Sequence, residues 1–269
     1  MNIVQLHERV KFWIDTVAST RFDSMDIDNG LNIAIDNKVR ESYDQNRPMN
    51  KSDAFQRTQR IRDLLGPIVT KATKDTTGFG LVGATNMITI ASTSNYQHLV
   101  SLGIKIGTTI YDCHPLSYDR KTVLSSNPYR KARMTPTVRM YYNEIDGNIE
   151  ITHAHTAQLT DFELYYIKTP AIVNYGIEYT SAYSFIAGDI VVAAEQTVYN
   201  GVTYNIGEKI TIAAPNLSIT SGLVVFSYTE CDLRSSTHEE ISRRAAINCL
   251  MSGGQKEKAL LLREEITAF

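Results

Sequence analysis

Apolar residues near the start of the chain recur at intervals of three and four positions. Within residues 3–17 they form one stripe along a predicted helix, with charged residues on the opposite side. The stripe consists of Ile3, Leu6, Val10, Trp13, Ile14 and Val17. It predicts a helix that packs either within the chain or on a neighbouring subunit.

Two more helices are expected before the pattern changes. Asp26 or Asp28 would cap the second helix, which ends near residues 46–48. The third is expected over residues 52–65, because Gly66-Pro67 would end it. The sequence therefore predicts a helical region at the N-terminal end of the chain.

From Ile68 onward, β-branched, aromatic and small residues replace the helical spacing. Asp146-Gly147 separates two such runs and predicts a tight hairpin, because glycine accepts a positive φ angle at no steric cost. Strands are predicted within residues 81–90, 99–110, 137–143, 148–152 and 161–169. These runs predict a mainly antiparallel β region.

A second, smaller β region is predicted for residues 178–230. Asn200-Gly201 is the sharpest turn signal in the chain and lies within a predicted hairpin of residues 198–207. Short strands bury little surface on their own. We therefore expect this module to pack against the rest of the chain or against a neighbouring subunit.

The chain ends in two predicted helices. Thr237 and Glu240 have the spacing of a capping box at the start of the first, which breaks at residues 252–254. The second covers residues 255–266. Together the elements predict an α+β fold: a central antiparallel β body with N-terminal helices, an inserted small β module and C-terminal helices. The expected regions are 1–66, 67–177, 178–230 and 231–269.

Composition and charge narrow the functional classes. Hydrophobic residues make up 43% of the chain and charged residues 21%, which is enough for a buried core. The 15 Tyr residues against 1 Trp favour strands and interfaces, because Tyr combines an apolar ring with a hydroxyl. The net charge of −2 excludes a broad, nonspecific polyanion binder but leaves local basic patches open.

The cysteines and the N-terminus indicate where the chain folds. Cys113, Cys231 and Cys249 have no metal-ligand spacing and are expected to stay reduced. Charged residues interrupt the N-terminus too early for a signal peptide, and no apolar run approaches the ~18–20 residues of a membrane span. We therefore expect folding in a cytoplasm and no membrane partner.

Three patterns resemble chemical sites without meeting their requirements. His153 and His155 would share one face of a strand, as zinc ligands do, but only Asp161 offers a third ligand. Cys113-His114 joins a thiol to an imidazole in sequence, whereas catalytic pairs are normally neighbours in space. Residues 252–256 lack the phosphate-loop spacing. No enzyme activity, metal or cofactor is predicted.

Two surfaces are candidate binding sites. The densest basic stretch starts at Tyr129, and it is compatible with phosphate contacts, with interface ion pairs or with a solvated loop. Its candidate interface or nucleic-acid-facing residues are Arg120, Lys121, Arg130, Lys131 and Arg133, with Arg139 nearby. The candidate interface at the tip of the small β module consists of Tyr199, Asn200, Gly201 and Tyr204.

Several short segments follow one another in a distinctive order. After the helix at 3–17 come Phe22 and the run Asp28-Asn29-Gly30-Leu31-Asn32. The strand Leu164-Tyr165-Tyr166-Ile167-Lys168-Thr169-Pro170, the hairpin from Tyr199 to Gly207 and the helix that starts His238-Glu239-Glu240-Ile241 complete the order. In this order the chain resembles head-to-tail connector or neck ring proteins of tailed bacteriophages, particularly the short-tailed crAss-like group.

The resemblance implies a non-enzymatic virion subunit. Such a subunit forms a homo-oligomeric ring, typically about twelve-fold, in the head-to-tail connector, neck or tail. Its partners would be further copies of itself, the portal, and adjacent ring or tail proteins. Double-stranded DNA would pass through transiently without sequence-specific binding. The protein would assemble in the host cytoplasm and reside in the virion.

Two other functions stay open from the sequence. A hydrolase would need a cleft that gathers Cys113, His114 and a carboxylate. A receptor- or carbohydrate-binding virion module would use the tyrosine-rich small β region as its surface. It would need exposed, coplanar rings among Tyr179, Tyr183, Tyr199 and Tyr204.

Overall fold

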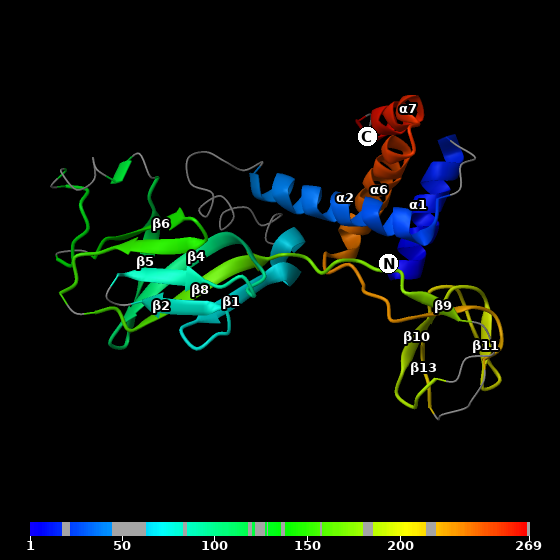
Figure 1. Ribbon diagram of the computed structural model, residues 1–269, viewed down its shortest axis with the longest axis horizontal. Helices are drawn as coiled ribbons and strands as arrows, with labels where there is room; N and C mark the ends of the chain where they lie inside the picture. Colours follow the sequence, from blue (N-terminus) through cyan, green and yellow to red (C-terminus); the bar gives the residue numbers. More distant parts are fainter. Residues whose placement is uncertain are drawn as a thin grey trace. The chain divides into compact units, whose positions relative to one another are not determined.

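The chain divides into two units (Figure 1). One combines Met1–Glu41 with Pro170–Phe269, and the other consists of Ser42–Thr169. The helices at both ends of the chain therefore belong to one unit, together with the small β module. The computed structural model describes residues 1–17, 22–44, 63–82, 85–117, 120–121, 127, 129–135, 138–156, 158–179, 185–213 and 219–267.

An eight-stranded sheet forms the body of the Ser42–Thr169 unit. In spatial order it contains β1 (Val69–Thr73), β8 (Asp161–Lys168), β4 (Tyr96–Ile106), β5 (Thr109–Pro115), β6 (Met140–Ile145), β7 (Asn148–Thr152), β3 (Met87–Ile90) and β2 (Phe79–Val82). Neighbouring strands are antiparallel except β5 and β6, which run parallel. The long central strands supply much of its core, including Leu102 and Ile104 of β4 and Phe162 and Leu164 of β8.

Two of the predicted β-rich stretches each span two strands of this sheet. Residues 81–90 lie in two strands, β2 and β3, and the turn between them holds Asn86 at φ +51°. Residues 99–110 lie in β4 and β5, which reverse at Gly107, where φ is +63°. β-branched residues on both sides of these short turns obscured them in the sequence. The Asp146-Gly147 hairpin between β6 and β7 and the strand at β8 are confirmed.

A short 3₁₀ helix, Gly66–Ile68, leads into β1. Residues 63–65 before it are helical, which agrees with a predicted helix that ends at Gly66-Pro67. The remainder of that predicted helix, residues 52–62, lies outside the described residues.

The small β module contains two sheets. One has the order β13 (Lys209–Thr211), β10 (Ile190–Ala193), β15 (Val224–Phe226) and β9 (Ile177–Tyr179), and the other has the order β12 (Val202–Tyr204), β11 (Thr197–Tyr199) and β14 (Ile219–Ser221). The predicted hairpin turn is confirmed, with Asn200 at φ +50° and Gly201 at φ +75°. Phe185, Val191, Tyr199, Ile210 and Val224 form part of a core of its own.

The unit of Met1–Glu41 and Pro170–Phe269, which we call the helical unit, also contains α1 (Ile3–Val17), α2 (Ser24–Asp44) up to Glu41, α6 (His238–Ser252) and α7 (Lys256–Thr267). A 3₁₀ turn, Ser235–Thr237, precedes α6. The predicted capping box is wrong, because the Thr237 hydroxyl donates to the Arg234 carbonyl at 2.7 Å instead of capping α6. Helices and mainly antiparallel sheets together confirm the predicted α+β class.

Helices α2 and α6 cross at Gly30. A Cβ atom there would lie 2.7 Å from the Cys249 Sγ and 2.9 Å from the carbonyl oxygen of Ala245. The Asn248 side chain donates to the Gly30 carbonyl at 3.2 Å, so the crossing also contains a polar contact. This approach requires glycine in the middle of a helix, at a cost in helix propensity.

The replacement Gly30→Ala should destabilise the helical unit by about 1–3 kcal/mol, because the methyl group overlaps a backbone carbonyl. Helix propensity alone predicts the opposite sign, a gain of about 1 kcal/mol. Urea unfolding followed by the fluorescence of Trp13, the 1 Trp in the chain, measures the change in this unit. Asn29→Ala, on the exposed side of the same helix, should be neutral or slightly stabilising. A stabilising Gly30→Ala would contradict the close crossing.

Candidate functional site

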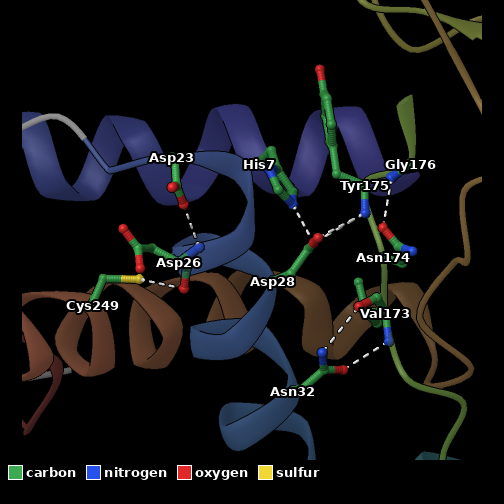
Figure 2. A network of polar contacts seen from close by, with 10 residues as sticks. All are labelled: His7, Asp23, Asp26, Asp28, Asn32, Val173, Asn174, Tyr175, Gly176 and Cys249. Atoms are coloured by element: carbon green, nitrogen blue, oxygen red, sulfur yellow. Dashed lines mark hydrogen bonds and ion pairs between the residues drawn. The ribbon is translucent and has the colours of Figure 1, made fainter. Parts of the chain in front are cut away.

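The segment Pro170–Gly176 is fixed to α2 by side chains one helical turn apart (Figure 2). The Asn32 side chain donates to the Val173 carbonyl at 3.0 Å, and it accepts the Val173 N–H at 2.7 Å. The Asp28 carboxylate accepts the Tyr175 N–H at 3.1 and 3.0 Å. The helix thus holds an extended segment by its backbone, as a neighbouring strand would.

His7 of α1 also contacts the Asp28 carboxylate. Its Nε2 lies 2.8 Å from the Asp28 Oδ1, and its side chain is 1% exposed against 15% for Asp28. An ionised carboxylate only accepts hydrogen bonds, so Nε2 carries the hydrogen. The His7 ring also packs on the Tyr175 ring, with centroids 4.4 Å apart. Three segments far apart in sequence therefore meet at Asp28; we call His7, Asp28, Asn32, Val173 and Tyr175 the clasp.

The clasp continues into the start of the small β module. Asn174 exchanges two backbone hydrogen bonds with Thr229, at 3.3 and 2.8 Å, and its side chain accepts the Gly176 N–H at 2.8 Å. At Gly176 the φ angle is +86°, and a Cβ atom would lie 2.3 Å from the Phe226 carbonyl oxygen. Glycine is thus required where the clasped segment enters β9.

The N-terminal cap of α2 differs from the prediction. The Asp23 carboxylate accepts the Asp26 N–H at 2.8 Å, so Asp23 caps the helix, and neither Asp26 nor Asp28 does. Asp26 contributes its carbonyl, which lies 3.5 Å from the Cys249 Sγ. Burial raises the pKa of Cys249 to about 12, so the thiol is protonated at neutral pH and acts as a packing residue.

Ion pairs join α1 and α2 to α6. The Arg9 guanidinium donates to both oxygens of Glu239 at 2.7 and 2.8 Å, a bidentate arrangement. These hydrogen bonds hold the pKa of Glu239 below its ordinary value. Arg244 lies 2.8 Å from both Glu41 and Glu240, and Lys38 also pairs with Glu240. The run His238-Glu239-Glu240 thus supplies the carboxylates that fix the terminal helices to one another.

The predicted basic residues divide into paired and exposed groups. Lys121 donates to both oxygens of Glu150 at 2.6 Å, so its charge is compensated within the fold. Arg133 is half-buried, and its backbone exchanges two hydrogen bonds with Arg139 at 3.1 and 2.7 Å. Arg120, Arg130 and Lys131 are exposed. Only these three present their charge at the surface.

One of the four residues predicted to form an interface at the module tip is buried. Tyr199 is 3% exposed, and its hydroxyl accepts the Ala213 N–H at 3.0 Å, so this ring belongs to the core. Tyr204 packs against the same core, while Asn200 and Gly201 are exposed at the turn. Successive side chains of a strand point to opposite sides, and the sequence did not show which side of this short strand faces the core.

The tyrosine platform expected of a carbohydrate-binding module is absent from the described residues. Tyr179 packs edge-on against Phe185 at 5.9 Å, Tyr199 is buried and Tyr204 is half-buried. Tyr183 lies outside the part of the chain that the structure describes. The three described rings line a core instead of forming a coplanar surface.

Neither thiol–imidazole nor metal chemistry is assembled among the described residues. Cys113 is buried in β5 and His114 is exposed, because successive residues of a strand point to opposite faces. Burial raises the pKa of Cys113 to about 12. His155 donates its N–H to the His153 Nδ1 at 3.1 Å, and Asp161 pairs with Lys105. Within the described ranges no three His, Cys, Asp or Glu side chains are placed to hold a metal ion.

Comparisons with known proteins identify no family. No protein-family model matches the chain, and no curated protein has a matching sequence. Among the helices of the described residues, none combines the length and the apolar character needed to cross a bilayer.

Asp28→Ala should destabilise the helical unit by about 1–3 kcal/mol, because it leaves the Tyr175 N–H and the His7 imidazole without their acceptor. Urea unfolding followed by Trp13 fluorescence measures this loss. Asp36→Ala is a matched control on the same helix, where the carboxylate pairs with Arg40 one turn away and contributes less than about 0.5 kcal/mol. Equal effects of the two replacements would rule out a special role for the clasp.

The helical unit should also lose stability in acid through Glu239. Its folded-state pKa lies below the ordinary value of 4.5, so its contribution is complete above that pH and is lost as the pH falls through the lower folded-state pKa. The difference in free energy of unfolding between the natural chain and Glu239→Gln should therefore shrink over this interval. Arg9→Gln should show the same pH dependence, and the double variant should add little. Additive, pH-independent effects would contradict the pairing.

Proposed function

We propose that the protein is a structural subunit of a tailed-phage virion that forms an oligomeric ring in the head-to-tail connector, neck or tail. The order of its segments resembles that of connector and neck ring proteins. The proposal has no catalytic step, and copies of the chain, the portal and adjacent ring or tail proteins are its partners. DNA would pass through the assembled ring without sequence-specific binding.

The observation that carries this proposal is the apolar surface of the four helices. Each helix presents at least one large apolar side chain that is about half-exposed or more. They are Phe12 (49%), Met25 (73%), Ile33 (52%), Met251 (47%), Leu260 (53%) and Leu261 (57%). Apolar residues that are exposed singly are normal on a protein surface, whereas a contiguous apolar patch is characteristic of protein–protein contacts.

Helix α7 has apolar residues on a buried side and on an exposed side. Ala259 and Leu262 are buried, at 1% and 0% exposure, and fix one side of the helix to the rest of the unit. Leu260 and Leu261 lie on another side and are exposed. A helix with apolar residues on both sides is typical of one that is covered on both. A neighbouring copy in a ring would supply the second cover.

The construction of the helical unit also fits a ring subunit. A cyclic ring uses two different surfaces of each subunit, so the surfaces must keep a fixed relation. The clasp and the Arg9–Glu239 pair hold α1, α2 and α6 together with the entry to the small β module. Each subunit therefore presents its helices and its β module to neighbouring subunits from one unit, whose parts these hydrogen bonds and ion pairs hold together.

Mass photometry of the purified chain, alone and mixed with the portal protein, tests the proposal. We expect oligomers or portal-bound assemblies, with ring-shaped particles in negative-stain images. The double replacement Leu260→Ser and Leu261→Ser should abolish them while circular dichroism stays unchanged. The matched control, Leu260→Met and Leu261→Met, keeps the apolar surface and should still assemble. A chain that stays monomeric up to high concentration and ignores the portal would overturn the proposal.

A further inference from the structure

Hydrogen bonds to the side chain and the carbonyl of Asn127 hold the basic stretch in a turn. The Asn127 side-chain oxygen accepts the Tyr129 N–H at 2.9 Å and the Arg130 N–H at 3.3 Å. The Asn127 carbonyl accepts the N–H groups of Arg130 and Lys131 at 3.2 and 3.0 Å. We call Asn127, Tyr129, Arg130 and Lys131 the basic turn.

Two side chains from beyond the turn fix it to the sheet. The Tyr141 hydroxyl, from β6, donates to the Arg130 carbonyl at 2.6 Å. The Arg139 guanidinium donates to the Tyr129 carbonyl. Arg139 therefore acts within the fold, while the side chains of Tyr129, Arg130 and Lys131 make no hydrogen bond or ion pair with a described residue.

The turn presents an aromatic ring beside two cations. Tyr129 is 80% exposed, the largest exposure among the large apolar and aromatic side chains described. Arg130 and Lys131 are exposed and form no ion pair with any described residue. Some other exposed cations do pair with carboxylates, as Lys71 does with Glu163 and Lys209 with Glu230.

The local charge is strongly positive in a chain whose net charge is −2. From residue 120 to residue 143 the sequence contains Arg120, Lys121, Arg130, Lys131, Arg133 and Arg139 and no Asp or Glu. Lys121 is compensated by Glu150 from outside this stretch. Arg130 and Lys131 thus keep a local field that attracts anions.

We infer that the basic turn is a contact site for the phosphate backbone of a nucleic acid, with Arg130 and Lys131 at the phosphates and Tyr129 against a sugar or an unpaired base. Cations next to an exposed aromatic ring are typical of sequence-independent nucleic-acid contacts. An acidic protein surface offers carboxylates to the cations, whereas a nucleic acid offers phosphates to the cations and sugars or bases to the 80% exposed ring. The inference extends the proposed function, because a ring that surrounds DNA needs weak and sequence-independent contacts.

Fluorescence anisotropy with a labelled 30-base-pair duplex and a 30-nucleotide single strand tests the site on the isolated chain, so it does not depend on ring formation. At low salt we expect weak binding to both, and the logarithm of the affinity should fall linearly with the logarithm of the salt concentration. The double replacement Arg130→Gln and Lys131→Gln should weaken duplex binding at least tenfold and reduce the salt slope by about 2. No binding at low salt, or an unchanged slope, would overturn the inference.

Three further variants separate the site from a general effect of charge. Lys74→Gln with Lys256→Gln removes the same two charges from other exposed positions and should leave binding almost unchanged. Tyr141→Phe keeps every charge but releases the Arg130 carbonyl, so it should weaken binding severalfold. Tyr129→Ala should affect the single strand more than the duplex. Equal losses in the two charge-removal variants would show that only net charge matters.

The same measurements distinguish an acidic protein partner. In that case neither nucleic acid would bind to the turn, and mass photometry would show assemblies that Arg130→Gln with Lys131→Gln dissociates. Normal rings without nucleic-acid binding would overturn this inference alone. Nucleic-acid binding by a chain that never assembles would leave the inference standing and overturn the ring.

Discussion

A carboxylate withdrawn from water needs hydrogen-bond donors in place of the solvent it has lost, and Asp28 obtains them from two other parts of the chain. One is the imidazole of His7 in α1, and the other is the backbone N–H of Tyr175. If either segment moved away, the carboxylate would lose a partner in a half-buried position. The packing of α1, the position of α2 and the course of the segment into the small β module therefore depend on one side chain. Asn32 and Gly30 extend this constraint, because the same helix must also clasp Val173 and cross α6 at close range.

The sequence predicted the elements better than the contacts between them. The helices at both ends, the Asp146-Gly147 and Asn200-Gly201 turns and the strand β8 were predictable because their signals are local: helical spacing, a positive φ angle at glycine and a β-rich run. The strand ends at Asn86 and Gly107 were not predictable, because the residues around these turns favour strands on both sides. The cap at Asp23 was missed because several aspartates follow one another and each satisfies the same rule.

The contacts of the clasp were not predictable, although two of its residues form a recognisable pattern in the sequence. Asp28 and Asn32 lie four residues apart, so they share one face of α2, and a polar pair inside an apolar pattern is the available signal. That signal does not say which segment the pair meets, since Val173 and Tyr175 are more than 140 positions away. Likewise, composition marked the basic stretch, but only the structure separates Lys121, which Glu150 neutralises, from Arg130 and Lys131, which stay exposed.

The distribution of charge and apolar surface connects these features to the proposed function. In the helical unit, Glu239 and Glu240 pair with Arg9, Lys38 and Arg244. Little free positive charge therefore remains where these helices meet. Its helices also leave several large apolar side chains exposed, and contacts between apolar surfaces are weakly affected by salt. The basic turn of the other unit has the opposite character, since its cations form no ion pair with a described residue and its ligand contacts would be screened by salt. Assembly and nucleic-acid contact would therefore respond differently to ionic strength: salt that weakens the second should leave the first intact. A ring that must stay closed while DNA slides through it requires this combination, with strong contacts between subunits and weak, screened contacts to the cargo.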